Sequence, residues 1–518
     1  RLASAIVSLG VQPGDRVALV SENRYEWIIT DLAIQLALAV HVPIQPTLAG
    51  PQIAWQLRHC GCRVTFISGP HQAAKLAPLA AELPTGLQCI SFDPCQSTDG
   101  FAVEDFARLC ERGNPAEGHR LEKIAREKIT PQSLATILYT SGTTGEPKGV
   151  MLTQGNLASN VCNTIQASEP TDNTVRLNLL PLSHIFARTC DLYGWLVEGS
   201  RMALAESRET VLADCQAVHP TTLNGVPYFY DKVYRGLCAS GKQNTPGALR
   251  AELGGAIERC CAGGAALPDH LYEYFHAQGV PLIQGYGLSE SSPVITISTL
   301  THHRRGSCGR PIPGIEVRIA DDGEILTRGP HVMTGYYQNP QATADVLKGG
   351  WLATGDIGRL DADGFLYITG RKKEILVTSG GKNIAPVFLE SLLTQDPLIL
   401  QAMVIGDARS YLAALIVPNA DVLKSELSRR GIVASHEAAL AHPEILALYR
   451  ARIDHQLAGV SPHEQVRKFT LLPRPFSIEA GELTPKLSLR RQTIGERYKA
   501  QIEAMYSQPQ VQSLKPKA

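Results

Sequence analysis

Short β-branched runs alternate with helical stretches from residue 1 to about residue 370, and this alternation limits the fold more than any other feature. The runs are RVALV (16–20), VTFIS (64–68), ATILYT (135–140) and VRLNLLPL (175–182). Strands separated by helices form βα units, so we expect an α/β fold of mixed sheets covered by helices. A chain of 518 residues exceeds what one hydrophobic core organises, which indicates at least two domains.

Two hairpin signals precede residue 371, and a stretch rich in charged and small residues, GRKKEILVTSGGKNIAP, follows over residues 370–386. Asp-Gly turns flanked by alternating apolar residues lie within 317–328 and 359–370. We therefore expect a large N-terminal domain over residues 1–371 and a small C-terminal domain over residues 372–518. The last dozen residues are polar and contain proline, so we expect a disordered tail.

The charge balance argues against a nucleic-acid partner. Lys plus Arg and Asp plus Glu each total 49, so no charge excess is present to bind a polyanionic backbone. Twelve cysteines are scattered without the C-x-x-C spacing of zinc or redox sites, and the tight pairs are Cys60/Cys62 and Cys260/Cys261. Reduced thiols are typical of a cytoplasmic enzyme.

The longest apolar run near the start covers residues 27–42. Asp31 and Gln35 interrupt this run, which is also shorter than the roughly 20 apolar residues that a membrane-spanning helix needs. We therefore expect a buried helix here. The chain opens with Arg1 in the middle of a pattern, so we expect further residues upstream, where any targeting signal would lie.

A loop built to hold phosphate follows the strand expected at 135–140. The stretch YTSGTTGEPKG covers residues 139–149. Its glycines free the backbone to turn N–H groups inward, its hydroxyls add donors, and its lysine adds a positive charge. The residues that supply these groups are Ser141, Gly142, Thr143, Thr144, Gly145, Lys148 and Gly149.

This loop differs from a Walker A motif at two positions. Pro147 stands where that motif requires glycine, and Gly149 follows the lysine where serine or threonine is required. A kinase or P-loop ATPase is therefore disfavoured. A flexible linker is disfavoured as well, because Pro147 and Lys148 lie between two apolar strands.

At this loop the sequence resembles the adenylate-forming enzymes, a family that includes acyl-CoA synthetases, peptide-synthetase adenylation domains and luciferases. Further stretches follow in the family's order over nearly the whole chain: LPLSHIFAR (180–188), CAGGAALP (261–268), QGYGLSESS (284–292), TGDIG (354–358), GRKKEILVTSGGKNIAP (370–386) and LTPKLSLRR (483–491). The resemblance implies that ATP and Mg²⁺ activate a carboxylic acid as an acyl-adenylate. The acyl group would then pass to the thiol of coenzyme A.

Two of these stretches would supply the nucleotide pocket. By resemblance, Tyr286 would stack on adenine beside Gly287, and the small residues Gly264 and Ala265 would let the flat base approach the backbone. Glu290 would bind Mg²⁺, because this hard ion takes carboxylate oxygen and leaves its other ligand positions to phosphate and water. The stretch lacks the third glycine of the dinucleotide pattern, which disfavours a Rossmann site.

The same resemblance assigns the remaining nucleotide contacts and a hinge. Thr144 and Lys148 would hold the triphosphate and its metal, while Asp356 and Arg371 would bind the ribose hydroxyls. Lys373 would be the hinge about which a small, mobile α+β lid exchanges an adenylating face for a thioester-forming face.

The C-terminal lysine of the family is displaced in this sequence. Relatives place it three residues before an arginine, and Ser488 occupies that position before Arg491. Lys486 lies two residues earlier, which moves its root by about 6.6 Å along an extended strand. We expect Lys486 to supply the cation that acid activation needs, with Arg490 and Arg491 as weaker candidates.

Within the family, the chain looks most like long-chain fatty acyl-CoA synthetases. Residues 180–188, 463–472 and 483–491 carry this likeness. A fatty acid is therefore the expected substrate, and His184 would form a wall of its site rather than shuttle a proton. Such an enzyme would contact membrane surfaces transiently to collect its acid.

Three alternatives stay open. A fatty acyl-AMP ligase would load a carrier protein and ignore free coenzyme A. A peptide-synthetase adenylation domain would need a neighbouring carrier domain. A degenerate homologue would bind nucleotide and acyl groups without turnover, and its only support is the serine at position 488.

Overall fold

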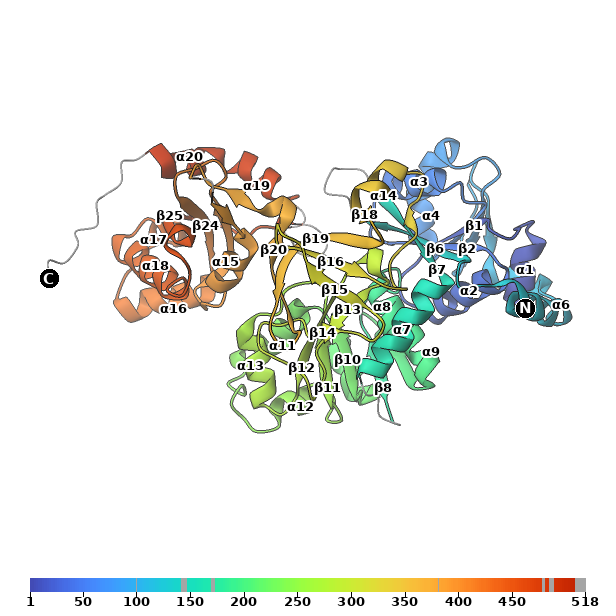
Figure 1. Ribbon diagram of the computed structural model, residues 1–518, viewed down its shortest axis with the longest axis horizontal. Helices are drawn as coiled ribbons and strands as arrows, with labels where there is room; N and C mark the ends of the chain where they lie inside the picture. Colours follow the sequence, from blue (N-terminus) through green and yellow to red (C-terminus); the bar gives the residue numbers. More distant parts are fainter. Residues whose placement is uncertain are drawn as a thin grey trace. The chain divides into compact units, whose positions relative to one another are not determined.

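The computed structural model describes residues 1–98, 100–140, 147–168, 173–380, 382–477, 480–483 and 489–507. The chain forms two compact units, residues 1–354 with 359–367, and residues 355–358 with 368–518 (Figure 1). The expected boundary between residues 371 and 372 and the hinge at Lys373 stay predictions. The expected disordered tail lies almost wholly outside the described residues.

The first sheet of the large unit has the strand order β17-β7-β6-β2-β1-β3-β4-β5. Neighbours run parallel from β6 to β5, whereas β7 and β17 are added antiparallel. The strands are β1 (Arg16–Val20), β2 (Val40–Ile44), β3 (Val64–Ile67), β4 (Gln88–Ser91), β5 (Val103–Asp105), β6 (Leu134–Thr140), β7 (Lys148–Thr153) and β17 (Gly335–Tyr336).

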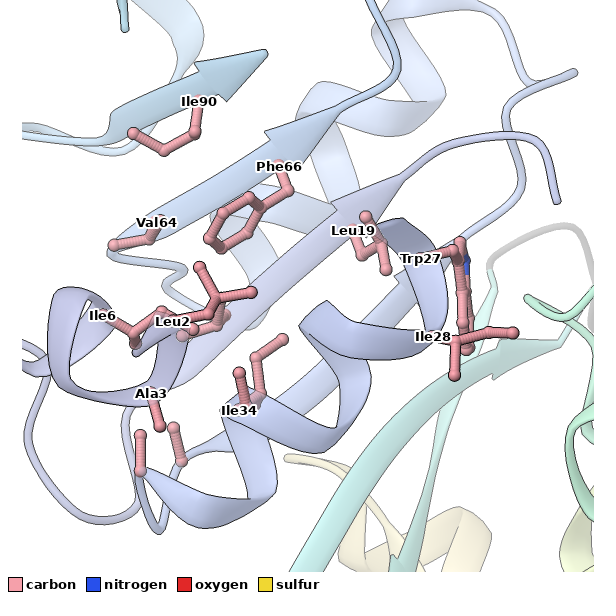
Figure 2. Close-up of a cluster of buried hydrophobic side chains, with 14 of the residues drawn as sticks. Leu2, Ala3, Ile6, Leu19, Trp27, Ile28, Ile34, Val64, Phe66 and Ile90 are labelled. Atoms are coloured by element: carbon pink, nitrogen blue, oxygen red, sulfur yellow. The ribbon is translucent and has the colours of Figure 1, made fainter. Parts of the chain in front are cut away.

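Helices cover both faces of this sheet. In β1, Val17 and Leu19 pack into one core, while Ala18 and Val20 pack into another, as the two-residue period of a strand requires. Figure 2 shows the first core, where Leu19 and Trp27 lie among other apolar side chains. The covering helices are α1 (Leu2–Ser8) and α2 (Tyr25–Leu36) on the first core, and α3 (Gly50–His59) and α4 (Pro70–Leu76) on the second.

The buried helix expected over residues 27–42 is only partly present. Helix α2 ends at Leu36, Leu38 adopts a φ of 60°, and the chain then enters β2. The expectation was wrong beyond Leu36 because periodicity does not separate a short buried strand from a buried helix. No helix within the described residues is long and apolar enough to cross a membrane.

The second sheet has the strand order β14-β13-β12-β11-β10-β8-β9. It is parallel from β9 to β12, and β13 and β14 are antiparallel. The strands are β8 (Val175–Asn178), β9 (Arg201–Leu204), β10 (Thr222–Gly225), β11 (Arg259–Ala262), β12 (Leu282–Gly287), β13 (Val294–Ile297) and β14 (Arg310–Pro311).

Helices also cover the second sheet. Cys215, Tyr230, Leu249 and Phe275 reach its core from α10 (Val211–Val218), α11 (Pro227–Ala239), α12 (Ala248–Glu252) and α13 (Asp269–Ala277). Helix α7 (Gln154–Ser168) packs against β13. The strand expected over residues 175–182 ends at Asn178, whose side-chain amide donates to the Leu180 carbonyl and so starts a turn.

Both hairpins predicted from Asp-Gly turns are confirmed. Strand β15 (Glu316–Ile319) pairs with β16 (Glu324–Arg328), and β19 (Trp351–Leu360) pairs with β20 (Leu366–Arg371). The turn glycines Gly323 and Gly364 have φ values of 83° and 81°, which glycine adopts without steric cost. The third sheet also contains β18 (Leu347–Lys348), which follows α14 (Pro340–Val346).

The C-terminal unit is α+β, as expected. Strand β24 (Leu412–Pro418) lies between two hydrophobic cores. Its even-numbered residues 412–416 pack with helices α15, α16 and α18, and its odd-numbered residues 413–417 pack with helices α19 and α20. The elements are β21 (Leu376–Val377), β22 (Asn383–Ile384), α15 (Pro386–Leu393), β23 (Ile399–Ile405), β24 (Leu412–Pro418), α16 (Ala420–Arg430), α17 (His436–Leu440), α18 (Pro443–Gln456), β25 (Val466–Leu471), α19 (Arg491–Arg497) and α20 (Lys499–Ser507).

Candidate active site

The expected phosphate loop connects two neighbouring antiparallel strands of the first sheet, β6 and β7. Strand β6 ends at Thr140 and β7 begins at Lys148, and these two residues face each other in the antiparallel ladder. The sequence therefore placed the strands on either side of the loop correctly. Residues 141–146, with the expected phosphate ligands Ser141, Gly142, Thr143, Thr144 and Gly145, lie outside the described residues.

Lys148 and Glu290 meet at one tyrosine. The Lys148 ammonium lies 4.9 Å from the centroid of the Tyr336 ring, and the Tyr336 hydroxyl donates to Glu290 Oε1 over 2.8 Å. Burial is the main cause that raises the pKa of Tyr336, and the Glu290 carboxylate raises it further, so the hydroxyl keeps its proton. Two residues expected at the triphosphate are thus brought together, through a tyrosine that the sequence did not indicate.

Two asparagines of α7 hold the segments that carry Glu290 and Tyr336. The fully buried Asn160 amide donates to the Val294 carbonyl over 2.7 Å and to the Ser291 carbonyl, and its oxygen accepts from the Val294 N–H. One turn earlier, Asn156 donates to the carbonyls of Pro330 and Val332 over 2.8 and 2.9 Å. Their spacing of four residues puts both amides on one face of the helix.

Tyr286 and Gly287 end strand β12, directly before the short turn that contains Glu290. Tyr286 packs against an apolar cluster that includes Val294 and Ile297 of β13. A Cβ atom at Gly287 would lie 1.7 Å from the Pro293 carbonyl oxygen, so only glycine fits this approach of two backbones. The apolar contacts of Tyr286 and the close backbone contact at Gly287 together hold the Tyr286 side chain in position.

His184 caps the short helix α8 (Ile185–Ala187), and its Nδ1 accepts from the Phe186 N–H over 3.2 Å. In the neutral ring the proton then lies on Nε2. A Cβ atom at Gly263 would lie 2.9 Å from the Phe186 ring, which places the turn after His184 beside the glycines of residues 261–268. Gly264 (φ 78°) and Ala265 are exposed next to this contact.

Asp356 and Arg371 form an ion pair between β19 and β20. The guanidinium Nε lies 3.2 Å from the Asp356 carboxylate, which is buried, while the Arg371 side chain is 57% exposed. A buried carboxylate beside an exposed cation is suited to accept hydrogen bonds from a diol at the surface. The two expected ribose ligands are therefore neighbours.

The lysine candidate for acid activation, Lys486, lies outside the described residues. Of the weaker candidates, Arg491 is engaged elsewhere: it donates to both carboxylate oxygens of Glu390, over 2.8 and 2.5 Å, at the start of α19. Such a bidentate pair fixes the guanidinium.

The carboxylate donors among the described residues suit a magnesium ion that takes most of its ligands from the nucleotide and water. Among them, no group of three or more His, Cys, Asp or Glu side chains could hold a metal ion alone. The half-buried Glu290 offers one carboxylate, and one of its oxygens is already bound by Tyr336. Mg²⁺ takes one or two carboxylates and completes its shell with phosphate and water, which suits this donor set.

Comparison with known proteins identifies the family. The model of the AMP-binding enzyme family matches residues 1–337, and that of the AMP-binding enzyme C-terminal domain matches residues 373–510. The chain belongs to the AMP-binding enzyme family. The adenylate-forming resemblance predicted from the motifs is confirmed.

Among the AMP-binding enzymes, the long-chain-fatty-acid–CoA ligase FadD15 of Mycobacterium bovis is 35% identical over 98% of this chain and 90% of its own length. The anthranilate CoA ligase AuaEII, solved with anthranoyl-AMP, has a TM-score of 0.76 and 21% identity over 97% of this chain and 90% of its own. The o-succinylbenzoate coenzyme A synthetase of Bacillus subtilis, solved with ATP and magnesium, has a TM-score of 0.69 and 23% identity over 92% and 89%. These structures share the two-domain fold.

Proposed function

We propose that this AMP-binding enzyme activates a long-chain fatty acid with ATP as an acyl-adenylate and transfers the acyl group to coenzyme A. The convergence of Lys148 and Glu290 on Tyr336, beside the hairpin that carries the phosphate loop, is the observation on which the proposal rests. A cation for phosphate and a carboxylate for a metal ion are the groups that bind Mg·ATP. The name of the similar ligase FadD15 supports the fatty acid and the acceptor.

In the first step, an oxygen of the substrate carboxylate attacks the α-phosphorus of ATP. The bond between this phosphorus and the bridging oxygen of pyrophosphate breaks, and acyl-AMP forms. Because two anions approach each other, positive charge around the phosphoryl oxygens lowers the barrier. Lys148 would supply part of that charge, bound Mg²⁺, held by Glu290 and Thr144, would supply another part, and Lys486 would supply the cation next to the α-phosphoryl group.

We propose that Tyr286 stacks on adenine, with Gly287, Gly264 and Ala265 leaving room for the base. The ribose would bind the Asp356–Arg371 pair. His184, with Nδ1 occupied by its own helix cap, would form a wall of the acid site rather than move a proton.

In the second step, the thiol sulfur of coenzyme A attacks the acyl carbon of the mixed anhydride. The bond from this carbon to the phosphate oxygen breaks, AMP leaves, and the thiol proton passes to solvent. We propose that the C-terminal domain swings about Lys373 between the steps. Lys373 lies in a one-turn helix, Lys372–Glu374, directly after β20, and such element ends absorb large backbone changes.

We propose Lys486 as the cation of acid activation. Its support is chemical: the α-phosphoryl group needs a nearby cation, and the neighbouring Arg491 is fixed by Glu390. Lys486→Ala should slow acyl-AMP formation at least about 100-fold while acyl transfer from supplied acyl-AMP changes little. Lys424→Ala, on the exposed face of α16, serves as the control. Equal loss in both half-reactions would remove this assignment.

We also propose that the enzyme is cytoplasmic, because its twelve cysteines are free thiols. We further propose that it contacts membrane surfaces transiently. Helix α2 exposes Tyr25, Ile29 and Leu36 by 68%, 40% and 37%, and their spacing places them on one helix face. Cosedimentation with phosphatidylcholine vesicles should fall for the Tyr25→Ser, Ile29→Ser double variant. Unchanged cosedimentation would reject α2 as the contact.

The decisive experiment incubates the purified protein with Mg·ATP and fatty acids of increasing length, with and without coenzyme A, and detects acyl-AMP and acyl-CoA by mass spectrometry. Acyl-CoA from the wild type and its loss in Lys148→Ala would support the proposal. Acyl-AMP that persists with coenzyme A would indicate transfer to a carrier protein instead. Neither product from any acid would indicate a homologue that binds without turnover.

A further inference from the structure

Tyr336 lies between two side chains of opposite charge. Its ring faces the Lys148 ammonium, and its hydroxyl donates to Glu290. Within the described residues Lys148 and Glu290 form no direct ion pair, although one tyrosine touches both. Opposite charges attract each other more strongly in a half-buried site than in bulk water. The Tyr336 side chain contacts the ammonium through its ring and the carboxylate through its hydroxyl.

The backbone fixes Tyr336 in this position. Strand β17 pairs antiparallel with β7, with Tyr336 opposite Val150, two residues beyond Lys148. The Tyr336 N–H donates to the Thr343 hydroxyl of α14 over 2.9 Å. The side chain is also buried in an apolar cluster that includes Val150 and Leu152. A tyrosine held from three sides cannot easily follow either charge.

We propose that Tyr336 is a positioning residue that keeps Lys148 and Glu290 from neutralising each other and holds each toward its own ligand. The ring would leave the Lys148 ammonium available to phosphate. The hydroxyl, by binding Oε1, would turn the other oxygen of Glu290 toward Mg²⁺. This inference rests on the proposed function, because it assigns the support of the same triphosphate site.

The two parts of the side chain make separate predictions. Tyr336→Phe keeps the ring but removes the hydroxyl, so ATP without metal should bind as in the wild type. The gain in affinity that Mg²⁺ gives should shrink about tenfold, as expected for the loss of a hydrogen bond to a charged group. Tyr336→Ala removes the ring as well, so Lys148 and Glu290 can pair and metal-free ATP should also bind more weakly.

The measurement is isothermal titration calorimetry of ATP into the full chain, once with excess Mg²⁺ and once with EDTA. Tyr337→Phe is the matched control, since this neighbouring ring packs on the other side with His59, at 5.8 Å between centroids. The Mg²⁺ gain of Tyr337→Phe should equal that of the wild type. A Tyr336→Phe variant with an unchanged Mg²⁺ gain would overturn the proposal.

A double variant separates positioning from general destabilisation. Glu290→Gln should itself lose the Mg²⁺ gain, and adding Tyr336→Phe to it should then change ATP binding less than twofold, because the partner of the hydroxyl is already altered. Full additivity of the two losses would also overturn the proposal. A wild type that binds Mg·ATP but makes no acyl-AMP would reject the proposed function and leave this result standing.

Discussion

The guanidinium of Arg188 donates to the Asp31 carboxylate over 2.6 Å, and both side chains are fully buried. Arg188 follows His184, the proposed wall of the acid site, by one helical turn, whereas Asp31 lies in α2. Arg188 also donates to the hydroxyls of Tyr193 and Thr136 over 2.8 and 2.9 Å. The ion pair therefore ties the turn after His184 to the first sheet and its covering helix.

Removing the charge of Asp31 should destabilise the large unit. Asp31→Asn leaves the Arg188 cation buried without a partner charge, which costs about 3–5 kcal/mol. Glu117→Gln is the control, because Glu117 pairs with Arg120 on the exposed face of α6 (Pro115–Lys128) and such pairs contribute at most about 1 kcal/mol. Urea unfolding followed by tryptophan fluorescence measures both. Equal losses would contradict the importance of the buried pair.

The same carboxylate makes stability depend on pH through His41. The Nδ1 of His41 donates to the Asp31 carboxylate over 2.6 Å. Burial, together with the Arg188 charge, nevertheless lowers the pKa of His41 to about 4. An unfolded histidine titrates near about 6.5, so between these values the unfolded chain binds more protons. The free energy of unfolding should therefore fall as pH drops from about 6.5 to about 4.

A comparison of two proteins over pH isolates this effect. The measurement compares pH 7.5, about one unit above the upper end of that range, with pH 4.5, about half a unit above its lower end. Between these two pH values, the midpoint of thermal unfolding should fall more for the wild type than for His41→Gln. Asp191, whose pKa burial raises to about 6, acts in the opposite direction but is common to both proteins. Parallel pH profiles would show that His41 is not the titrating group.

Local motifs predicted the residues that bear charge, but not the contacts between them. Lys148 and Glu290 could be named because each lies in a short stretch with a chemistry of its own. Tyr336 could not, because its contact with both depends on how β17 pairs with β7, across more than 180 residues of chain. The polar role of Asn160 has the same origin, since asparagine in a helix carries no signal of the loop that it binds.

The fold was predictable where one physical cause dominated. The Asp-Gly turns at positions 323 and 364 predicted two hairpins, and burial on both faces of the sheet explains why residues 17–20 of β1 are all apolar. The run over residues 27–42 was ambiguous because a helix and a buried strand both remove apolar residues from water. There the turn at Leu38, rather than hydrophobicity, ends the helix.

A methyl group at Gly287 should disrupt the proposed adenine site. The new Cβ would lie 1.7 Å from the Pro293 carbonyl oxygen, so β12 and the following loop must separate. Gly287→Ala should lose more than about 2 kcal/mol of stability and bind ATP at least tenfold more weakly. Gly285→Ala, in the same strand, meets nothing closer than 3.6 Å and should behave as the wild type. Calorimetry of ATP binding distinguishes them, and similar affinities would contradict the clash.

The amide of Asn160 should be required to hold Glu290 in place. Asn160→Ala leaves the carbonyls of Ser291 and Val294 and the Val294 N–H without this partner, which should cost at least about 2 kcal/mol of stability. Because the turn with Glu290 then loosens, the gain in ATP affinity on adding Mg²⁺ should fall, whereas metal-free ATP binding should change less. Cys162→Ala, at an exposed position of α7, is the control. If both variants keep the wild-type Mg²⁺ gain, the asparagine stabilises the fold without supporting Glu290 as the proposed metal ligand.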